Sequence, residues 1–185
     1  MRLAKVRSEI EGVRIIELKK HADDRGFFME TFHVEHFREM GLPESWAQAN
    51  QSFSYHGVLR GMHMQAKNPQ GKLIRPMYGT IYDAFVDLRE GSPTYGKWDG
   101  LWLNWEEPVA LYLPPGLAHG FFTASAGAIL SYLCTTTYDA ESDGGIAWDD
   151  PDVGIEWPFP EDFVPIVSTK DSALPRLAQL RGAGA

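Results

Sequence analysis

One segment of the chain gathers side chains that are suited to moving a proton. Residues 57–65 read Gly-Val-Leu-Arg-Gly-Met-His-Met-Gln, and Lys72 follows shortly after, so Arg60, His63 and Lys72 share a Gly-punctuated, strand-like stretch. A neutral histidine can act as a base near neutral pH, and fixed cations stabilise the oxyanion that forms when a proton leaves a carbon beside a carbonyl. The segment therefore indicates general acid–base chemistry next to a ketone.

Two further segments could complete such a site. His119 follows Pro114-Pro115-Gly116 and is predicted to lie on a turn, and Tyr132 lies in a strand-like run. A phenol can return a proton to the face opposite the base, which inverts the carbon. Taken singly, buried or surface histidines, cations and tyrosines are usually structural. Composition and spacing alone thus indicate no more than a β-barrel with an acid–base pocket.

Other kinds of site have less support in the sequence. A mononuclear metal site needs about three or four ligands, and His63 has Met64 and Gln65 beside it instead of a second histidine. The chain has no Gly-x-Ser-x-Gly segment and no Gly-rich phosphate loop. Its single cysteine, Cys134, lies in an apolar run and is predicted to be a buried thiol. We therefore expect neither a bound metal nor covalent catalysis.

The composition is that of a globular protein. The chain has 185 residues, 44% hydrophobic and 23% charged, which favours one domain over residues 1–185. Its net charge of −8 argues against nucleic-acid binding, which needs a basic surface. The N-terminus lacks the apolar stretch of a signal peptide, and no run reaches the roughly 18 apolar residues of a membrane span. We therefore expect a cytoplasmic protein without a membrane segment.

Short strands separated by turn residues dominate the rest of the pattern. One short helix is predicted over residues 33–40, where Phe37 and Met40 have helical spacing and Gly41 ends the run. Gly- and Pro-containing turns separate the predicted strands, and this spacing is typical of an all-β sandwich or barrel. The predicted strands cover residues 13–18, 27–32, 73–77, 80–88, 98–104, 109–113, 120–123 and 128–137.

Many ordered segments of the chain resemble the dTDP-4-dehydrorhamnose 3,5-epimerase family. The resemblance runs from about Asp24 to about Pro175, and its segments have compatible order and spacing. The matching stretches are residues 24–30, 48–52, 57–65, 70–72, 87–98, 116–121, 149–151, 155–158 and 168–171.

The resemblance implies a cupin-type jelly-roll β-barrel with a few short helices, a homodimer, and catalysis without a metal or other cofactor. The implied substrate is a dTDP-linked 4-keto-6-deoxy sugar, inverted at C3 and C5 in dTDP-L-rhamnose or related deoxysugar biosynthesis. His63 would be the base, Asp171 its carboxylate partner, Tyr132 the acid and Lys72 the group that stabilises the enolate. The residues implied to bind substrate are Arg25, Phe28, Glu30, Gln48, Asn50, Arg60, His119, Tyr138, Asp143 and Lys170.

Several departures from the family pattern keep alternatives open. Asp143 stands where relatives often carry glutamate, Met62 and Met64 flank the histidine, and residues 76–78 read Pro-Met-Tyr. Such changes could repack the core, or they could mark an enzyme that inverts only C3 or only C5 in a secondary-metabolite pathway. A non-catalytic cupin that binds a sugar nucleotide or a metal is the third hypothesis.

Overall fold

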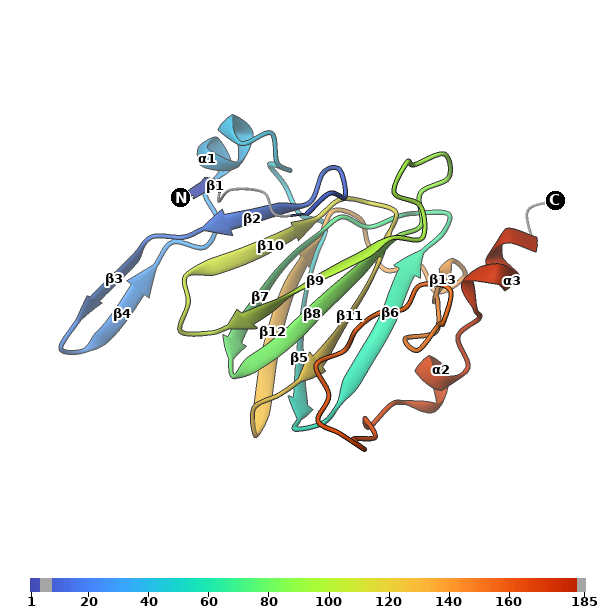
Figure 1. The fold of residues 1–185 in the computed structure, drawn as a ribbon. Coiled ribbons are helices and arrows are strands. Elements are labelled where there is room, and N and C mark those ends of the chain that lie inside the picture. The colour runs from blue at the N-terminus through green and yellow to red at the C-terminus, as the bar shows by residue number, and fades with distance from the viewer. Residues whose placement is uncertain (4–7, 183–185) are drawn as a thin grey trace.

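Two antiparallel sheets face each other in the computed structural model, which describes residues 1–3 and 8–182 (Figure 1). The six-stranded sheet has the order β1 (Arg2–Leu3), β2 (Arg14–Glu17), β10 (Val109–Leu113), β7 (Lys72–Tyr78), β12 (Gly127–Cys134) and β5 (Gln48–Tyr55). The five-stranded sheet has the order β13 (Asp143–Gly145), β6 (Leu59–Gln65), β11 (Leu117–Thr123), β8 (Thr80–Asp87) and β9 (Trp98–Asn104).

The remaining elements are short. A separate hairpin consists of β3 (Lys20–Asp23) and β4 (Gly26–Met29), and the helices are α1 (Val34–Glu39), α2 (Thr169–Ser172) and α3 (Leu177–Gly182). The predicted all-β jelly roll with a few short helices is confirmed. In the described part of the chain, no helix is long and apolar enough to cross a membrane.

The space between the sheets is filled by alternating inward-facing side chains. Ile74, Leu111 and Leu130 of the six-stranded sheet pack against Ile81 and Phe85 of the five-stranded sheet, and all five are at most 1% exposed. Burial of these apolar side chains is the main favourable contribution to folding. Two cavities lie on different sides of this core, and the one lined by residues of β5, β6, β7 and β12 holds the catalytic candidates.

Each sheet is also covered on its outer face. Helix α1 places the fully buried Phe37 against the six-stranded sheet. The irregular C-terminal segment packs on the five-stranded sheet, where Trp148 and Trp157 contact the buried cluster that contains Met62. This segment carries α2 and therefore brings residues from the end of the chain to β6.

Two glycines let β6 and β11 approach closely beside the site. A Cβ atom on Gly61, whose φ is +124°, would lie 2.5 Å from the Cα atom of Gly120. His63 pairs with His119 and Arg60 with Phe121, so β6 carries one extra residue, a β-bulge. Next to the bulge, Met62 packs in the outer layer and the adjacent His63 lines the inner cavity.

Candidate active site

A cavity of about 230 Å³ lies between the two sheets and gathers most of the predicted site residues. His63 comes from β6 of the five-stranded sheet, whereas Lys72 and Tyr132 come from β7 and β12 of the six-stranded sheet. The base and acid candidates therefore stand on opposite sheets, with the cavity between them. The other residues that line it are Gln48, Asn50, Met64, Gln65, Gln70, Tyr138, Asp143 and Lys170.

His63 and Asp171 form a hydrogen-bonded pair. Nε2 of His63 lies 2.7 Å from Oδ1 of Asp171, and the two side chains are 35% and 5% exposed. An ionised carboxylate can only accept hydrogen bonds, so Nε2 carries the hydrogen and Nδ1 of a neutral His63 keeps its lone pair. This is the arrangement that a carboxylate-oriented histidine base requires.

Helix α2 holds Asp171 in place. Ser168 is the N-cap of the helix, and its Oγ accepts the backbone N–H of Asp171 at 3.0 Å. Oδ2 of Asp171 accepts the backbone N–H of Gly61 at 3.1 Å. Burial opposes the charge of this carboxylate, but its hydrogen bonds with His63, Gly61 and Ser168 keep the pKa of Asp171 below its ordinary value. The carboxylate is therefore ionised throughout the neutral range.

On the six-stranded sheet, Tyr132 is suited to act as the acid and Lys72 as the cation of the site. Burial raises the pKa of the Tyr132 phenol, which therefore holds its proton at neutral pH. Burial lowers the pKa of Lys72, while the charges of Cys134, Asp83 and Asp143 act in the opposite direction. The Lys72 Nζ donates to the backbone carbonyl of His63 at 3.4 Å, which ties the cation to the strand that carries the base.

The rim of the cavity is a polar network. The Tyr138 hydroxyl donates to Oδ2 of Asp143 at 2.8 Å, and the Lys170 ammonium pairs with the same oxygen. Gln48 accepts the backbone N–H of Tyr138 at 2.7 Å and donates to Asn50 at 2.8 Å. These donors and acceptors lie where a polar ligand would enter.

Two predicted binding residues lie outside this cavity lining. Arg60 donates to Oγ of Ser54 at 2.9 Å and to the carbonyl of Phe53 at 3.1 Å. His119 is 7% exposed and lies within β11, so its predicted position on a turn is wrong. The turn ends at Gly116, and Gly120 serves the close approach of β6 and β11 instead of a bend. His119 stands beside His63 as its register partner.

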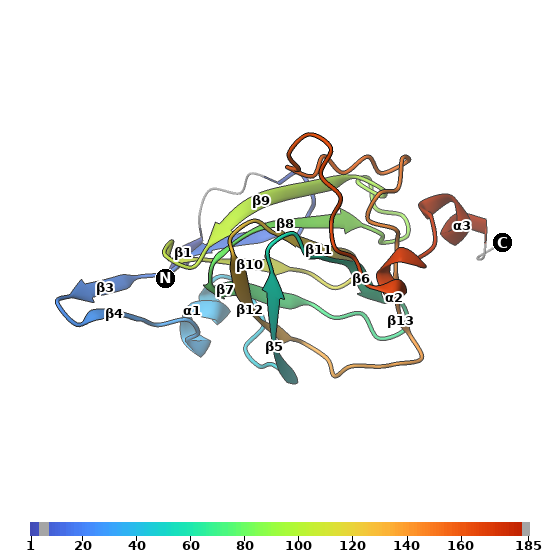
Figure 2. The same cartoon turned by 90° about the horizontal axis from the view of Figure 1, so that it is seen from below.

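Three other predicted binding residues lie on or next to the β3–β4 hairpin. The hairpin extends away from the two sheets (Figure 2). Arg25 pairs with Asp23 of the same hairpin at 2.5 Å, and Phe28 is 70% exposed. Glu30, just after β4, lies 3.4 Å from Nδ1 of His36. The single chain therefore does not bring these residues to the cavity that holds His63.

Sequence reasoning did not single out Asp83. It lies on β8, is fully buried, and its Oδ2 lies 2.8 Å from Nε2 of His119. The signal that could have found it is an aspartate in the otherwise apolar run of residues 81–86, because an unpaired buried charge is costly. Cys134, predicted to be buried, is buried and accepts a weak hydrogen bond from Asn50.

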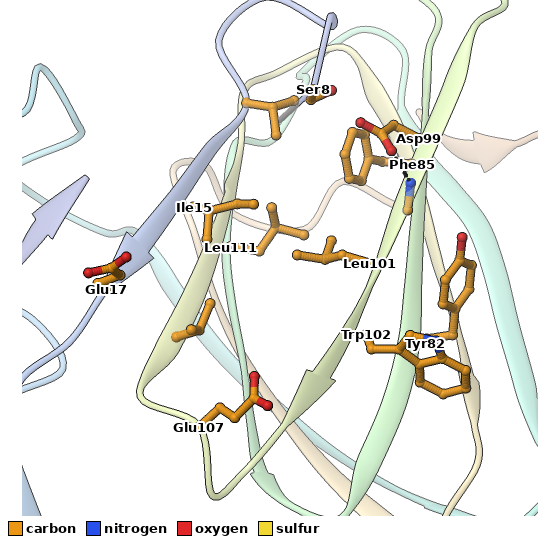
Figure 3. Close-up of a pocket in the computed structure, with 13 residues that line it drawn as sticks. Ser8, Ile15, Glu17, Tyr82, Phe85, Asp99, Leu101, Trp102, Glu107 and Leu111 are labelled. Atoms are coloured by element: carbon orange, nitrogen blue, oxygen red, sulfur yellow. Dashed lines mark hydrogen bonds between the residues drawn. The ribbon is translucent and has the colours of Figure 1, made fainter. Parts of the chain in front are cut away.

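A larger cavity, of about 530 Å³, lies on the other side of the core (Figure 3). Its lining comes from the β2, β8, β9 and β10 strands and is mostly apolar, with Ile15, Leu101 and Leu111 inside it and Glu17, Asp99 and Glu107 around it. It contains neither a histidine nor a cation among its lining residues. The volume of a cavity therefore does not identify the candidate active site. The presence of His63 and Tyr132 in the smaller cavity does.

Metal ligands do not cluster in the described residues. Across residues 1–3 and 8–182, no three histidine, cysteine, aspartate or glutamate side chains are placed so that they could hold a metal ion. The predicted independence from metal remains to be tested on purified protein.

Comparison with known proteins matches the chain to one family of sugar-nucleotide epimerases. The sequence model of the dTDP-4-dehydrorhamnose 3,5-epimerase family matches residues 7–179. The curated dTDP-4-dehydrorhamnose 3,5-epimerase of Methanothermobacter thermautotrophicus is 46% identical over 166 residues, which is 90% of each chain. The dTDP-4-dehydrorhamnose 3-epimerase of Streptomyces niveus is 42% identical over 95% of this chain and 84% of its own.

A solved structure agrees with the sequence matches. The 3,5-epimerase of Legionella pneumophila, in complex with dTDP-4-keto-L-rhamnose, superposes with a TM-score of 0.92 at 38% identity, over 98% of this chain and 96% of that one. Fold and site together define a jelly-roll protein with a carboxylate-held histidine across the cavity from a half-buried tyrosine. The chain belongs to the dTDP-4-dehydrorhamnose 3,5-epimerase family, and the predicted family is confirmed.

Proposed function

We propose that this protein is an isomerase that inverts C3 and C5 of dTDP-4-keto-6-deoxy-D-glucose through enolate intermediates, in dTDP-L-rhamnose or related deoxysugar biosynthesis. The observation that carries the proposal is His63 of the five-stranded sheet, held by Asp171 of α2, with Tyr132 of the six-stranded sheet across the cavity. The family match over residues 7–179 supplies the substrate class. The dTDP-sugar complex of the Legionella relative supports that class of ligand.

In the proposed first step, Nδ1 of His63 takes the proton from the carbon beside the C4 ketone. The C–H electron pair forms the new C=C bond, and the carbonyl electrons move to the C4 oxygen, giving an enolate. Asp171 accepts from Nε2 and stabilises the imidazolium that forms. Lys72 offsets the charge on the enolate oxygen, since its ammonium lies in the same cavity.

In the second step the Tyr132 phenol delivers a proton to the opposite face of the same carbon. The enolate electrons return, the C4 ketone re-forms and the carbon is inverted. The phenol suits this role because burial raises its pKa, so it starts protonated. His63 then releases its proton to solvent and the Tyr132 phenolate takes one up, which restores both groups. Two such cycles, at C3 and at C5, give the doubly inverted sugar.

The two competing functions differ in whether they require the catalytic residues of the cavity. A non-catalytic cupin has no need of the buried Asp171, whose carboxylate accepts hydrogen bonds from His63 and Gly61 and whose backbone N–H donates to Ser168. A C3-only epimerase uses the same residues, and the Streptomyces niveus relative has that name. Met64 beside His63 favours this second candidate, because it departs from the family pattern and lines the cavity.

The deciding experiment is proton NMR of purified enzyme with dTDP-4-keto-6-deoxy-D-glucose in deuterated water. We expect deuterium at both C3 and C5, with an L-sugar trapped by an added reductase. Label at C3 alone would assign the enzyme to the monoepimerases. Absence of label at both carbons would refute the proposed activity on this substrate.

We also propose that the protein works as a homodimer in which the β3–β4 hairpin of one copy reaches the cavity of the other. The hairpin projects from the sheets and leaves the aromatic Phe28 70% exposed. Exposed aromatic and arginine side chains are typical of surfaces that bind a partner or ligand. In this arrangement Arg25 and Phe28 would contact the nucleotide bound to the second copy, and Glu30 would lie near it.

Subunit mixing tests the hairpin proposal. Phe28→Ala and His63→Ala proteins are each expected to be poorly active, and a mixture that has exchanged subunits should recover activity. In a mixed dimer, one cavity has an intact His63 together with the wild-type hairpin of the other chain. Turnover of the mixture would be measured against the sum of the unmixed variants. A mixture no better than that sum, with subunit exchange verified by mass spectrometry, would contradict a hairpin acting across the dimer.

Three expectations stay predictions. They are a single domain over residues 1–185, a cytoplasmic location and catalysis without a metal or other cofactor. The two-sheet core that spans residues 10–130 supports the first of these, and metal analysis after dialysis would test the last.

A further inference from the structure

Asp83 has an unusual environment for an aspartate. Its side chain is fully buried on β8, and Oδ2 lies 2.8 Å from Nε2 of His119. The other oxygen, Oδ1, is buried and has no hydrogen-bond partner among the described residues. Buried polar atoms are nearly always hydrogen-bonded, because an unpaired one loses its hydration without gaining a partner, and the penalty is larger for a charged group. The fold alone therefore gives no reason to keep a carboxylate here.

Asp87, on the same strand, shows what a structural carboxylate looks like in this protein. It is as fully buried as Asp83, but it accepts from the Arg89 guanidinium and backbone, from Ser92 and from Thr94. These bonds fix the turn that follows β8. Among the described residues, the Asp83 carboxylate has one hydrogen-bond partner, His119, the register partner of His63.

The neighbours of Asp83 connect it to the site. His119 is the register partner of His63 across β6 and β11. The charges of Lys72 and His63 act on His119, and the charge of Asp83 acts on Lys72. Asp83 and His119 thus form a second carboxylate–histidine pair, on β8 and β11, beside the strand that carries His63.

We propose that Asp83 is a positioning residue for the epimerisation: its carboxylate holds His119 through Nε2 and supplies the negative charge that keeps the Lys72 ammonium in the cavity wall. This inference rests on the proposed function. Because the carboxylate accepts from Nε2–H, Nδ1 of a neutral His119 is left as a hydrogen-bond acceptor.

Asp83 affects catalysis through the charge of Lys72. Burial favours the neutral amine, and the negative charge of Asp83 opposes this effect. Loss of the carboxylate would leave a smaller fraction of the enzyme with a cation at the enolate oxygen. The transition state would lose stabilisation, whereas ground-state binding of the nucleotide, which uses the rim, would change little.

Kinetics of Asp83→Asn test the proposal, with Asp87→Asn as the matched control. Both changes neutralise a fully buried carboxylate on β8 while nearly conserving its shape. We expect Asp83→Asn to lower kcat by at least about 10-fold with KM changed less than about threefold, the sign of a lost transition-state interaction. Asp87→Asn should lower Tm but keep kcat per folded molecule. Similar kcat losses in both variants, or none in Asp83→Asn, would overturn the proposal.

A second measurement is independent of activity and is made on the wild-type protein. Two-dimensional NMR of wild-type protein with ¹⁵N-labelled histidine reports which ring nitrogen of His119 carries hydrogen, and the signal is assigned by its loss in His119→Gln. We expect a neutral ring with hydrogen on Nε2 near pH 7. Hydrogen on Nδ1 alone, or an imidazolium, would overturn the proposal. If wild-type enzyme incorporates no deuterium into the sugar, the proposed function fails, but this tautomer is still readable.

Discussion

Replacing His63 by alanine is expected to slow the exchange of sugar C–H protons with solvent by at least about 10²-fold, the usual scale for a general base. His63 is the ring whose Nε2 is held by Asp171 and whose other nitrogen is left to take a proton. No other histidine lines the cavity among the residues that the structure describes. Deuterium incorporation at C3 and C5, followed by NMR at saturating substrate, measures the effect.

The matched control for this prediction is His56→Ala. His56 is exposed, and its Nδ1 lies 3.0 Å from the carbonyl of Ala124, outside the cavity. This variant should exchange protons at the wild-type rate. Asp171→Asn should resemble His63→Ala more than the control, because the amide carries no charge to stabilise the imidazolium. A His63→Ala protein with an undiminished exchange rate would remove His63 from the mechanism.

The sequence predicts the framework of the fold because turn residues separate its strands. Gly91, Pro108 and Gly116 lie in turns between strands that the pattern places within a few residues of their observed ends. The Gln48–Tyr55 strand was not predicted, because this strand at the edge of its sheet has little apolar alternation to reveal it. The four-residue α2 is equally hidden, since one turn of helix leaves no periodic pattern.

The site is less predictable than the fold because its parts are distant in sequence. The residues alone indicated an acid–base site from His63, Lys72 and Tyr132, which the structure brings to one cavity. Asp171 lies 108 positions from His63, and no spacing rule could pair them; the family resemblance suggested it. Asp83 escaped both kinds of reasoning, because its meaning depends on a single oxygen left without a partner.

Replacing Tyr132 by phenylalanine is expected to separate proton removal from inversion. Phenylalanine keeps the ring that packs against the core but lacks the hydroxyl that reprotonates the enolate. His63 can still remove a proton and return solvent deuterium to the same face. We therefore expect deuterium to enter the starting sugar at a rate within about 10-fold of wild type, while epimerised product falls by at least about 10²-fold. NMR of labelled substrate and of reductase-trapped product follows the two quantities in one sample.

Tyr112→Phe is the matched control for this separation. Tyr112 also lies on the six-stranded sheet and, like Tyr132, has its pKa raised by burial, but it packs on the outer face with Trp46, away from the cavity. Loss of the Tyr112 hydroxyl should leave the rates of deuterium entry and of product formation unchanged. If Tyr132→Phe instead lowered label entry and product formation equally, the phenol would be needed already for proton removal. The acid on the opposite face would then have to be sought among Lys72 and the other residues of the cavity wall.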